Sequence, residues 1–173
     1  MSTLTAKAEQ LRAALVRNVD TAPTAREQRE PLYDTVCARL GIGTAAAKLG
    51  ISVDTVAPGM RSCPYHFHYA QEEAFAILHG EGTLRVAGEM LPITAGDVIF
   101  IPPGPDYPHQ IINTSNAPLK YLSISTKESP EVVEYPDSGK YLAMAVGTRD
   151  GERAVFGRMH REKDDLDYWD GEP

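Results

Sequence analysis

The stretch that decides the fold runs from Gly59 to Gly80 and reads GMRSCPYHFHYAQEEAFAILHG. A second stretch, from Gly96 to Asn113, reads GDVIFIPPGPDYPHQIIN. Both contain histidines, and both mix short apolar runs with the Gly and Pro residues that end strands and form turns. The two stretches therefore indicate β-structure, and their polar residues are the first candidates for a functional site.

Three of the five histidines fall into one pattern with a glutamate. His66 and His68 are two residues apart, so both imidazoles would point to the same face of a strand. Glu73 begins an alternating run that would place a carboxylate opposite these rings. His109 begins another run, which would bring in a third imidazole from a distant strand. Such a cage suits one first-row divalent ion and leaves about two octahedral positions open for water or substrate.

Short apolar runs continue between Gly and Pro turns from about Ala46 onwards. Strands at this even spacing predict an all-β sandwich or barrel, and the lack of an internal repeat favours one barrel. The predicted strands are 49–57, 74–78, 83–87, 98–101, 110–113 and 119–126, with strand-like pieces at 131–135, 141–146 and 154–159.

The regions outside these motifs have a different character. Residues 5–19 predict an amphipathic helix, residues 32–40 are expected to form a second helical turn, and a polar linker lies between them. Residues 164–172 are acidic and aromatic; we interpret them as a solvated tail, with a strap packing Tyr168 and Trp169 on the barrel or a partner as the alternative. We divide the chain into an N-terminal helical and linker extension (1–45), a barrel core (46–130) and a C-terminal extension of strands with an acidic tail (131–173).

The composition excludes several classes of protein. The 173 residues are 42% hydrophobic and 24% charged, as expected for one globular domain. The net charge of −7 and the lack of a Lys/Arg run argue against nucleic acid and anionic membranes as partners. No stretch approaches the roughly 18 apolar residues of a membrane span, and the start does not read as a signal peptide. Cys37 and Cys63 lie far apart in sequence, which favours reduced thiols in a cytoplasmic protein.

At the quoted residues the chain resembles the cupin superfamily. The first cupin motif is similar to Gly59, His66-Phe67-His68, Glu73 and Gly80, and the second to Gly96, Pro102-Pro103-Gly104, His109 and Asn113. The resemblance covers about a third of the chain. It implies a single jelly-roll β-barrel that binds a metal ion, such as Fe, Mn, Ni or Zn, through His66, His68, Glu73 and His109.

The resemblance also bears on the neighbouring residues. The loop 105–108 before His109 is two residues longer than the common motif, and we expect Tyr107 in it to project near the open metal positions. Glu72 is an alternative to Glu73, but the step from Glu73 to Gly80 favours Glu73. Arg61 and Tyr65 are candidates for lining the pocket, whereas His79 and His160 are expected on the surface.

The chain also resembles a narrower group of single-domain bacterial cupins, which have similar sequences at the positions that correspond to 58–59, 64–68, 134–140 and 168–172. Some of its members are labelled sugar phosphate isomerases by analogy of fold. An isomerase would use the metal to polarise a carbonyl and hydroxyl, while a carboxylate or tyrosine, here Glu73 or Tyr107, moves a proton. For a phosphorylated substrate, Arg61 and Arg85 are the main basic candidates.

Two other functions fit the same pattern. One is an Fe(II) dioxygenase, with oxygen and substrate at the open metal positions. The other is a non-enzymatic module that binds a small molecule inside the barrel. In each case we expect a symmetric homodimer, because the flanking strands need a partner for their apolar faces.

Overall fold

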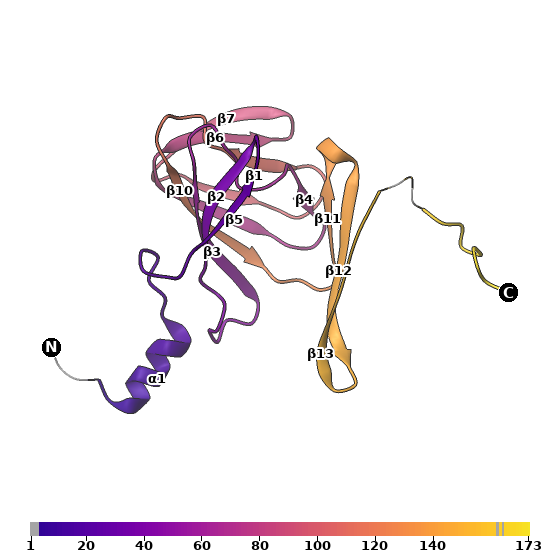
Figure 1. The fold of residues 1–173 in the computed structure, drawn as a ribbon, viewed down its shortest axis with the longest axis horizontal. Coiled ribbons are helices and arrows are strands. Elements are labelled where there is room, and N and C mark those ends of the chain that lie inside the picture. Colours follow the sequence, from indigo (N-terminus) through magenta and orange to yellow (C-terminus); the bar gives the residue numbers. More distant parts are fainter. Residues whose placement is uncertain (1–3, 162, 164) are drawn as a thin grey trace.

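The computed structural model describes residues 4–161, 163 and 165–173, which form a mostly β protein (Figure 1). Within these residues, helix α1 (Ala6–Leu15) comes first, and a short 3-10 helix, η1 (Pro136–Ser138), comes late in the chain. The strands are β1 (Ala25–Arg29), β2 (Tyr33–Arg39), β3 (Leu49–Val56), β4 (Phe67–His68), β5 (Glu73–His79), β6 (Glu81–Val86), β7 (Glu89–Thr94), β8 (Val98–Ile101), β9 (His109–Ile112), β10 (Leu119–Thr126), β11 (Glu131–Tyr135), β12 (Lys140–Arg149) and β13 (Glu152–Arg161).

The strands form three sheets around one main core. The orders are β1-β2-β3-β10-β5-β8, β7-β6-β9 and β13-β12-β11-β4. Residues of the first two sheets pack against each other, among them Phe75 and Tyr121 from one and Leu84 and Ile111 from the other. Burial of this apolar surface is the main stabilising term. The arrangement fits a jelly roll, so the predicted fold class is confirmed.

The predicted strands agree well with the observed ones. Those at 98–101, 119–126 and 131–135 have the predicted bounds, and the others shift by one to three residues at an end. Strand β7 was not predicted; it is an edge strand that is exposed except at Ile93 and contains Pro92. A proline is tolerated at a sheet edge but hides the strand pattern.

The N-terminal region differs from the sequence prediction in two segments. The expected polar linker contains β1, which pairs with β2 from Ala25↔Cys37 to Arg29↔Tyr33. The helical turn expected over 32–40 is wrong, because these residues form β2, which pairs with β3 from Thr35↔Val56 to Arg39↔Ser52. Pairing and burial in the sheet override the local apolar spacing. Helix α1 is shorter than the predicted 5–19, since Val16 has extended backbone angles.

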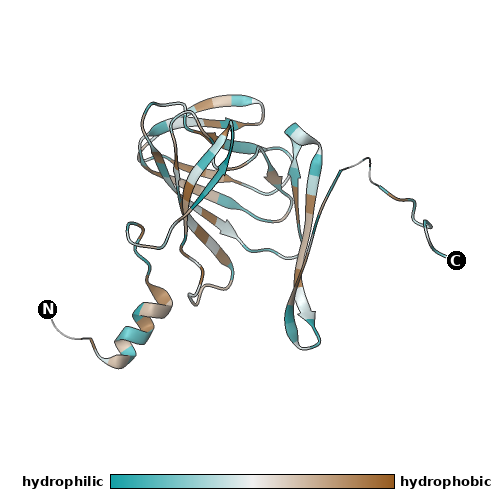
Figure 2. Ribbon diagram, viewed as in Figure 1, coloured by the Kyte–Doolittle hydropathy of each residue, from teal (hydrophilic) through white to brown (hydrophobic). Residues whose placement is uncertain are grey.

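Two segments lie outside the main core. Helix α1 buries none of its residues, and β12 and β13 form a long hairpin that projects beside the barrel (Figure 1). Hydrophobic residues run along this hairpin (Figure 2). In the tail, Tyr168 is 82% exposed and Trp169 69%, and they contact each other; Asp164 lies outside the described residues. No helix in the described part of the chain has the length and apolar character needed to cross a membrane.

Candidate metal centre

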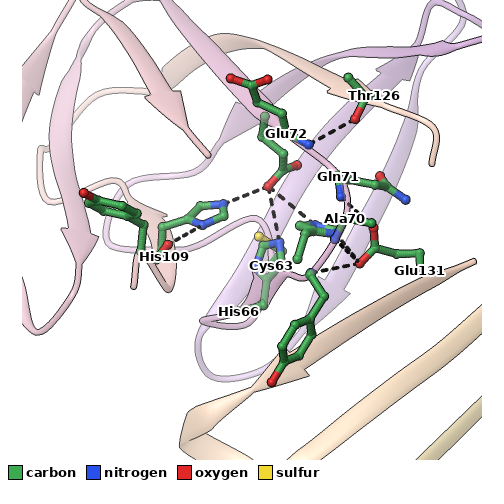
Figure 3. A network of polar contacts seen from close by, with 12 residues as sticks. Cys63, His66, Ala70, Gln71, Glu72, His109, Thr126 and Glu131 are labelled. Carbon is green, nitrogen blue, oxygen red and sulfur yellow. Dashed lines mark hydrogen bonds and ion pairs between the residues drawn. The ribbon is translucent and has the colours of Figure 1, made fainter. Parts of the chain in front are cut away.

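Four side chains from three segments of the chain meet inside the barrel. His66 precedes β4, His68 ends it, Glu73 begins β5 and His109 begins β9. His66 and His109 exchange backbone hydrogen bonds, the N–H of each donating to the carbonyl of the other at 3.1 and 2.8 Å. This bridge brings the histidine of the second motif next to those of the first (Figure 3).

The carboxylate oxygen Oε2 of Glu73 lies at the centre of the cluster. It is 2.9 Å from Nε2 of His109, 3.5 Å from Nε2 of His68 and 3.8 Å from Nε2 of His66. Two ligands each about 2.1 Å from one octahedral ion lie about 3 Å apart. The observed separations therefore fit neighbouring positions on one ion. Ligand atoms of His66, His68 and Glu73 all lie within 4.8 Å of one another, and the His109 ring is 4.7 Å from that of His66.

Several atoms of this cluster are buried without a hydrogen-bond partner. Among the described residues this holds for Oε2 of Glu73, Nε2 of His109 and Nδ1 of His68. The contact between Glu73 and His109 is close but is not aligned as a hydrogen bond. Leaving a buried polar atom unsatisfied costs about 1–3 kcal/mol. A divalent ion would satisfy the oxygen and the Nε2 atoms together, so the residues present fit a metal ion.

The protonation states also suit metal binding. Burial lowers the pKa of His68 to about 4, although Glu73 opposes this effect. For Glu73, burial disfavours the charged form, but the contacts with His109, His68 and His66 outweigh it and lower its pKa. At neutral pH the cluster therefore offers a neutral imidazole and an ionised carboxylate, the forms that bind metals.

Backbone carbonyls orient two of the rings. Nδ1 of His66 lies 2.8 Å from the carbonyl oxygen of Pro64, and Nδ1 of His109 lies 3.3 Å from that of Tyr107. A proton on Nδ1 satisfies these carbonyls and leaves the lone pair of Nε2 free for a metal. The extended loop before His109 thus contributes a backbone contact to the ligand that follows it.

One buried carboxylate near the cluster, Glu131, was not among the candidates from the sequence. It begins β11, is 1% exposed, and accepts the N–H groups of Tyr69, Ala70 and Gln71 at 3.1, 3.4 and 2.8 Å (Figure 3). These are three of the four residues in the loop between His68 and Glu73. Glu131 therefore fixes the spacing of two ligands from a position 62 residues away from Tyr69 in sequence, where no local signal marks it.

The ligands open into a cavity of about 600 Å³. It is lined by the hydroxyl-bearing residues Thr35, Ser52, Ser62, Tyr121, Ser123 and Ser125, by Glu27 and Asp54, by Cys37 and Cys63, and by Arg39 and Lys127. Both cysteines are free, and burial raises the pKa of Cys37 to about 11 and of Cys63 to about 12. The thiols are therefore protonated and poorly nucleophilic.

The remaining candidates from the sequence lie outside this cavity. The side chain of Tyr107 is 46% exposed and does not line it, so the structure brings its carbonyl, but not its hydroxyl, to the cluster. Glu72 is exposed, while Glu73 is buried among the histidines. His79 and His160 are exposed, as expected.

The basic candidates named from the sequence serve a structural purpose. Arg85 makes two hydrogen bonds to Asp137, at 2.7 and 2.9 Å, and its guanidinium lies 3.8 Å from the ring centre of Tyr65. The backbone of Arg61 forms isolated β-bridges with Tyr33 and with Ile112. Neither arginine lines the cavity, and neither does Tyr65.

Comparison with known proteins adds independent information. Residues 52–125 match the family model described as a cupin domain. The oxalate-binding protein of Thermotoga maritima is 39% identical over 67 residues, which make up 39% of this chain and 54% of that protein. The chain spans about half the length of the curated relatives it matches.

Two solved structures are similar over most of the chain. A candidate sugar phosphate isomerase from Acidithiobacillus ferrooxidans is 27% identical, with a TM-score of 0.66 and coverage of 89% of this chain and 90% of that one. A sugar phosphate isomerase of the cupin superfamily from Silicibacter pomeroyi is 21% identical, with a TM-score of 0.69 and coverage of 85% and 92%. At that identity the second likeness concerns the fold alone.

Proposed function

The chain contains a cupin domain, and from this premise we propose that it is a metal-dependent isomerase of a sugar or a sugar phosphate. One observation carries the proposal: three imidazole nitrogens lie within 3.8 Å of one carboxylate oxygen, in the wall of a cavity rich in hydroxyl groups. One divalent ion, such as Fe, Mn, Ni or Zn, would be held by His66, His68, Glu73 and His109.

The chemistry requires a hydrogen to move between adjacent carbons of the substrate. The bound ion would polarise the carbonyl and hydroxyl oxygens concerned. We assign the proton transfer to Glu73, the carboxylate at the cluster, with the hydroxyl of Tyr107 approaching from the rim when substrate is present. Ser123 and Ser125 would donate or accept hydrogen bonds with sugar hydroxyls, since a hydroxyl group can do both.

The similarity to the candidate isomerase from Acidithiobacillus ferrooxidans favours this reaction, because it extends over 89% of the chain and beyond the cupin domain. A second candidate function is binding without turnover. It is favoured by the relative from Thermotoga maritima, whose name describes an oxalate-binding protein. We further place the protein in the cytoplasm, where the free thiols of Cys37 and Cys63 would stay reduced.

The test begins with elemental analysis of protein purified without a metal-affinity tag. The metal-loaded protein is then incubated with aldoses and aldose phosphates, and conversion to ketoses is followed by NMR. We expect one equivalent of a divalent metal and a conversion that His68→Ala abolishes. Binding of these sugars without conversion would contradict the isomerase and indicate a non-enzymatic binding module. Substrate-dependent oxygen uptake by an iron-loaded sample would instead indicate a dioxygenase.

A further inference from the structure

We propose that Lys127, together with Arg39, forms an anion-binding site at the mouth of the cavity. The substrate would then be a small polyhydroxylated molecule that carries a phosphate or a carboxylate at the end held by these two cations. This inference rests on the proposed function and names its substrate class. The residues that carry it lie outside both sequence motifs and are brought to the cavity by strand pairing.

The register of the large sheet places Lys127 on the cavity side. Ser125 of β10 pairs with Glu73 of β5 on one side and with Gly50 of β3 on the other. Lys127 follows two residues later and continues the ladder, its N–H donating to the carbonyl of Lys48 at 2.9 Å. It therefore shares the face of Ser125 and lies about 7 Å further along the strand. This position is beyond the metal-binding carboxylate, toward the mouth.

Two glycines leave space beside the Lys127 side chain. A Cβ atom at Gly50 would lie 3.6 Å from Cε of Lys127 and 2.7 Å from Oγ of Ser125. A Cβ atom at Gly41 would lie 4.0 Å from Nζ of Lys127. Larger side chains at these positions would occupy the volume next to the ammonium group. The glycines thus leave room for the Lys127 side chain to reach across Gly50 toward Gly41, on the cavity side of the sheet.

Lys127 is held in no ion pair of the described chain, although the carboxylates of Glu27 and Asp54 line the same cavity. Among the described residues, the ion pairs of the chain do not include it. Arg39 lines the same cavity and donates to Glu27 at 3.0 Å, with the two side chains 66% and 56% exposed. Exposed pairs of this kind contribute about 0–1 kcal/mol. Arg39 can therefore turn from Glu27 to an incoming anion at little cost.

The spacing between Arg39 and the metal cluster suits a sugar phosphate. Arg39 and Glu73 lie on β2 and β5, which are separated by β3 and β10, so about 14 Å of sheet lies between them at about 4.8 Å per strand. Ser52 and Ser123 pair with each other on the strands between and line the cavity. A phosphorylated pentose or hexose would place its hydroxyls at these serines, whereas a molecule as short as oxalate would reach one end only.

The test measures equilibrium binding at the mouth, independent of turnover. Zinc-loaded protein is titrated with inorganic phosphate, ribose 5-phosphate, ribonate and ribose, while backbone amide shifts are followed by NMR. We expect phosphate and ribose 5-phosphate to shift the amides of Gly41, Gly50 and Lys127. Lys127→Ala should raise the Kd of both by about tenfold, as for loss of a charge-assisted contact. Lys48→Ala removes the same charge from a residue that does not line the cavity and should change Kd less than twofold.

Phosphate binding of equal strength in Lys127→Ala, or shifts confined to the metal cluster, would overturn the proposal. If ribonate binds in a way that depends on Lys127 and phosphate does not bind, the result would support the site and identify a carboxylate as its ligand group. Repeating the titration after metal removal distinguishes anion binding at the mouth from anion binding at the metal cluster. Anion binding that persists in a protein without isomerase activity would contradict the proposed function alone.

Discussion

Nδ1 of His68 lies 3.8 Å from the carboxylate of Glu131, and Nε2 of the same ring lies 3.5 Å from the carboxylate of Glu73. One imidazole therefore stands between two buried carboxylates, one in the cluster and one outside it. A carboxylate near the second nitrogen of a ligating histidine orients the ring and raises its basicity. Because Glu131 also holds the loop before Glu73, it is a positioning residue for two ligands.

The first prediction concerns Glu131→Gln. The change replaces one acceptor oxygen by an NH2 group, which cannot accept from the backbone N–H groups of Tyr69, Ala70 or Gln71. We expect metal affinity to fall by about 10–100-fold, as for other residues that support metal ligands. The free energy of unfolding of the metal-free protein should fall by about 1–3 kcal/mol. Competition with a chelating dye and urea denaturation measure the two effects.

Glu134→Gln is the matched control for this variant. Glu134 lies on the same strand, but its side chain accepts only from the exposed hydroxyl of Tyr69, at 3.1 Å. We expect neither metal affinity nor stability to change measurably. If the two variants lose metal affinity equally, Glu131 has no specific positioning effect.

The second prediction concerns the ligands themselves. His66→Ala and His68→Ala should each abolish stoichiometric metal binding and leave a folded β protein, because the main core is built without these residues. His79→Ala and His160→Ala, at exposed positions, should retain one metal per chain. Elemental analysis and far-UV circular dichroism test both parts. A His66→Ala/His68→Ala double variant with full metal occupancy would refute the assignment of the cluster.

Short-range patterns explain which parts of the site the sequence could predict. His66 and His68 were found because residues two apart on a strand share a face, and Glu73 and His109 because each begins an alternating run. These signals are local. Their convergence, however, depends on the bridge between His66 and His109, which pairs two segments that lie far apart in sequence.

Residues that reach the site through long-range pairing were missed. Arg39 lies on β2, a segment expected to be helical, and it lines the cavity only because β2 pairs with β3. Lys127 and Glu131 lie beyond the second motif and have no spacing relation to it. In contrast, Arg61 lies within the first motif and Arg85 between the two motifs, but neither lines the cavity. Proximity in sequence to a motif is a poor guide where the strands of a barrel alternate between inner and outer faces.

The third prediction concerns Asp54, which lines the cavity. Burial raises its pKa, although the hydroxyl of Ser52 opposes the shift by donating to Oδ2 at 2.9 Å. A carboxyl group whose folded pKa exceeds the unfolded one of about 3.9 destabilises the fold at higher pH, and this penalty disappears as the pH falls. Asp54→Asn should therefore raise the free energy of unfolding at pH 7 and have little effect at acid pH.

For Asp34→Asn we expect a stability change of the opposite sign at pH 7. A hydrogen-bonded ion pair with Arg26 lowers the pKa of Asp34, so this carboxylate stabilises the fold above the unfolded pKa and loses its contribution at acid pH. Asp34→Asn should be destabilising at pH 7. Urea denaturation at the two pH values compares the variants, and shifts of the same sign at pH 7 would contradict the assignment for Asp54.

The fourth prediction tests the hydroxyl of Tyr107. Because only the carbonyl of this residue contacts His109, Tyr107→Phe should leave metal affinity unchanged. If the hydroxyl closes on the substrate from the rim, binding of the sugar should weaken by about 1–3 kcal/mol. Calorimetric titration of the metal-loaded variant measures this difference. Unchanged sugar binding and turnover would leave Tyr107 with a structural role only.

The last prediction concerns assembly, and it starts from one face of the β12–β13 hairpin. Residues that pair directly share a face, so Leu142 and Val146 of β12 lie on the same side as Met159 and Val155 of β13. Val146, Val155 and Met159 remain 40%, 56% and 50% exposed. An apolar face of this kind suits the same face of a second chain across a two-fold axis.

We therefore propose a symmetric homodimer that buries this face. Val155→Glu would bring two like charges together at the axis and leave them desolvated, which disfavours association. Light scattering at micromolar concentration should show a dimer for the natural chain and a monomer for Val155→Glu, with metal binding retained because the cluster lies elsewhere. His160→Glu adds the same charge to the opposite face of β13 and should remain dimeric. A monomeric natural chain would contradict the proposal outright, and dissociation by both variants would place the interface on another surface.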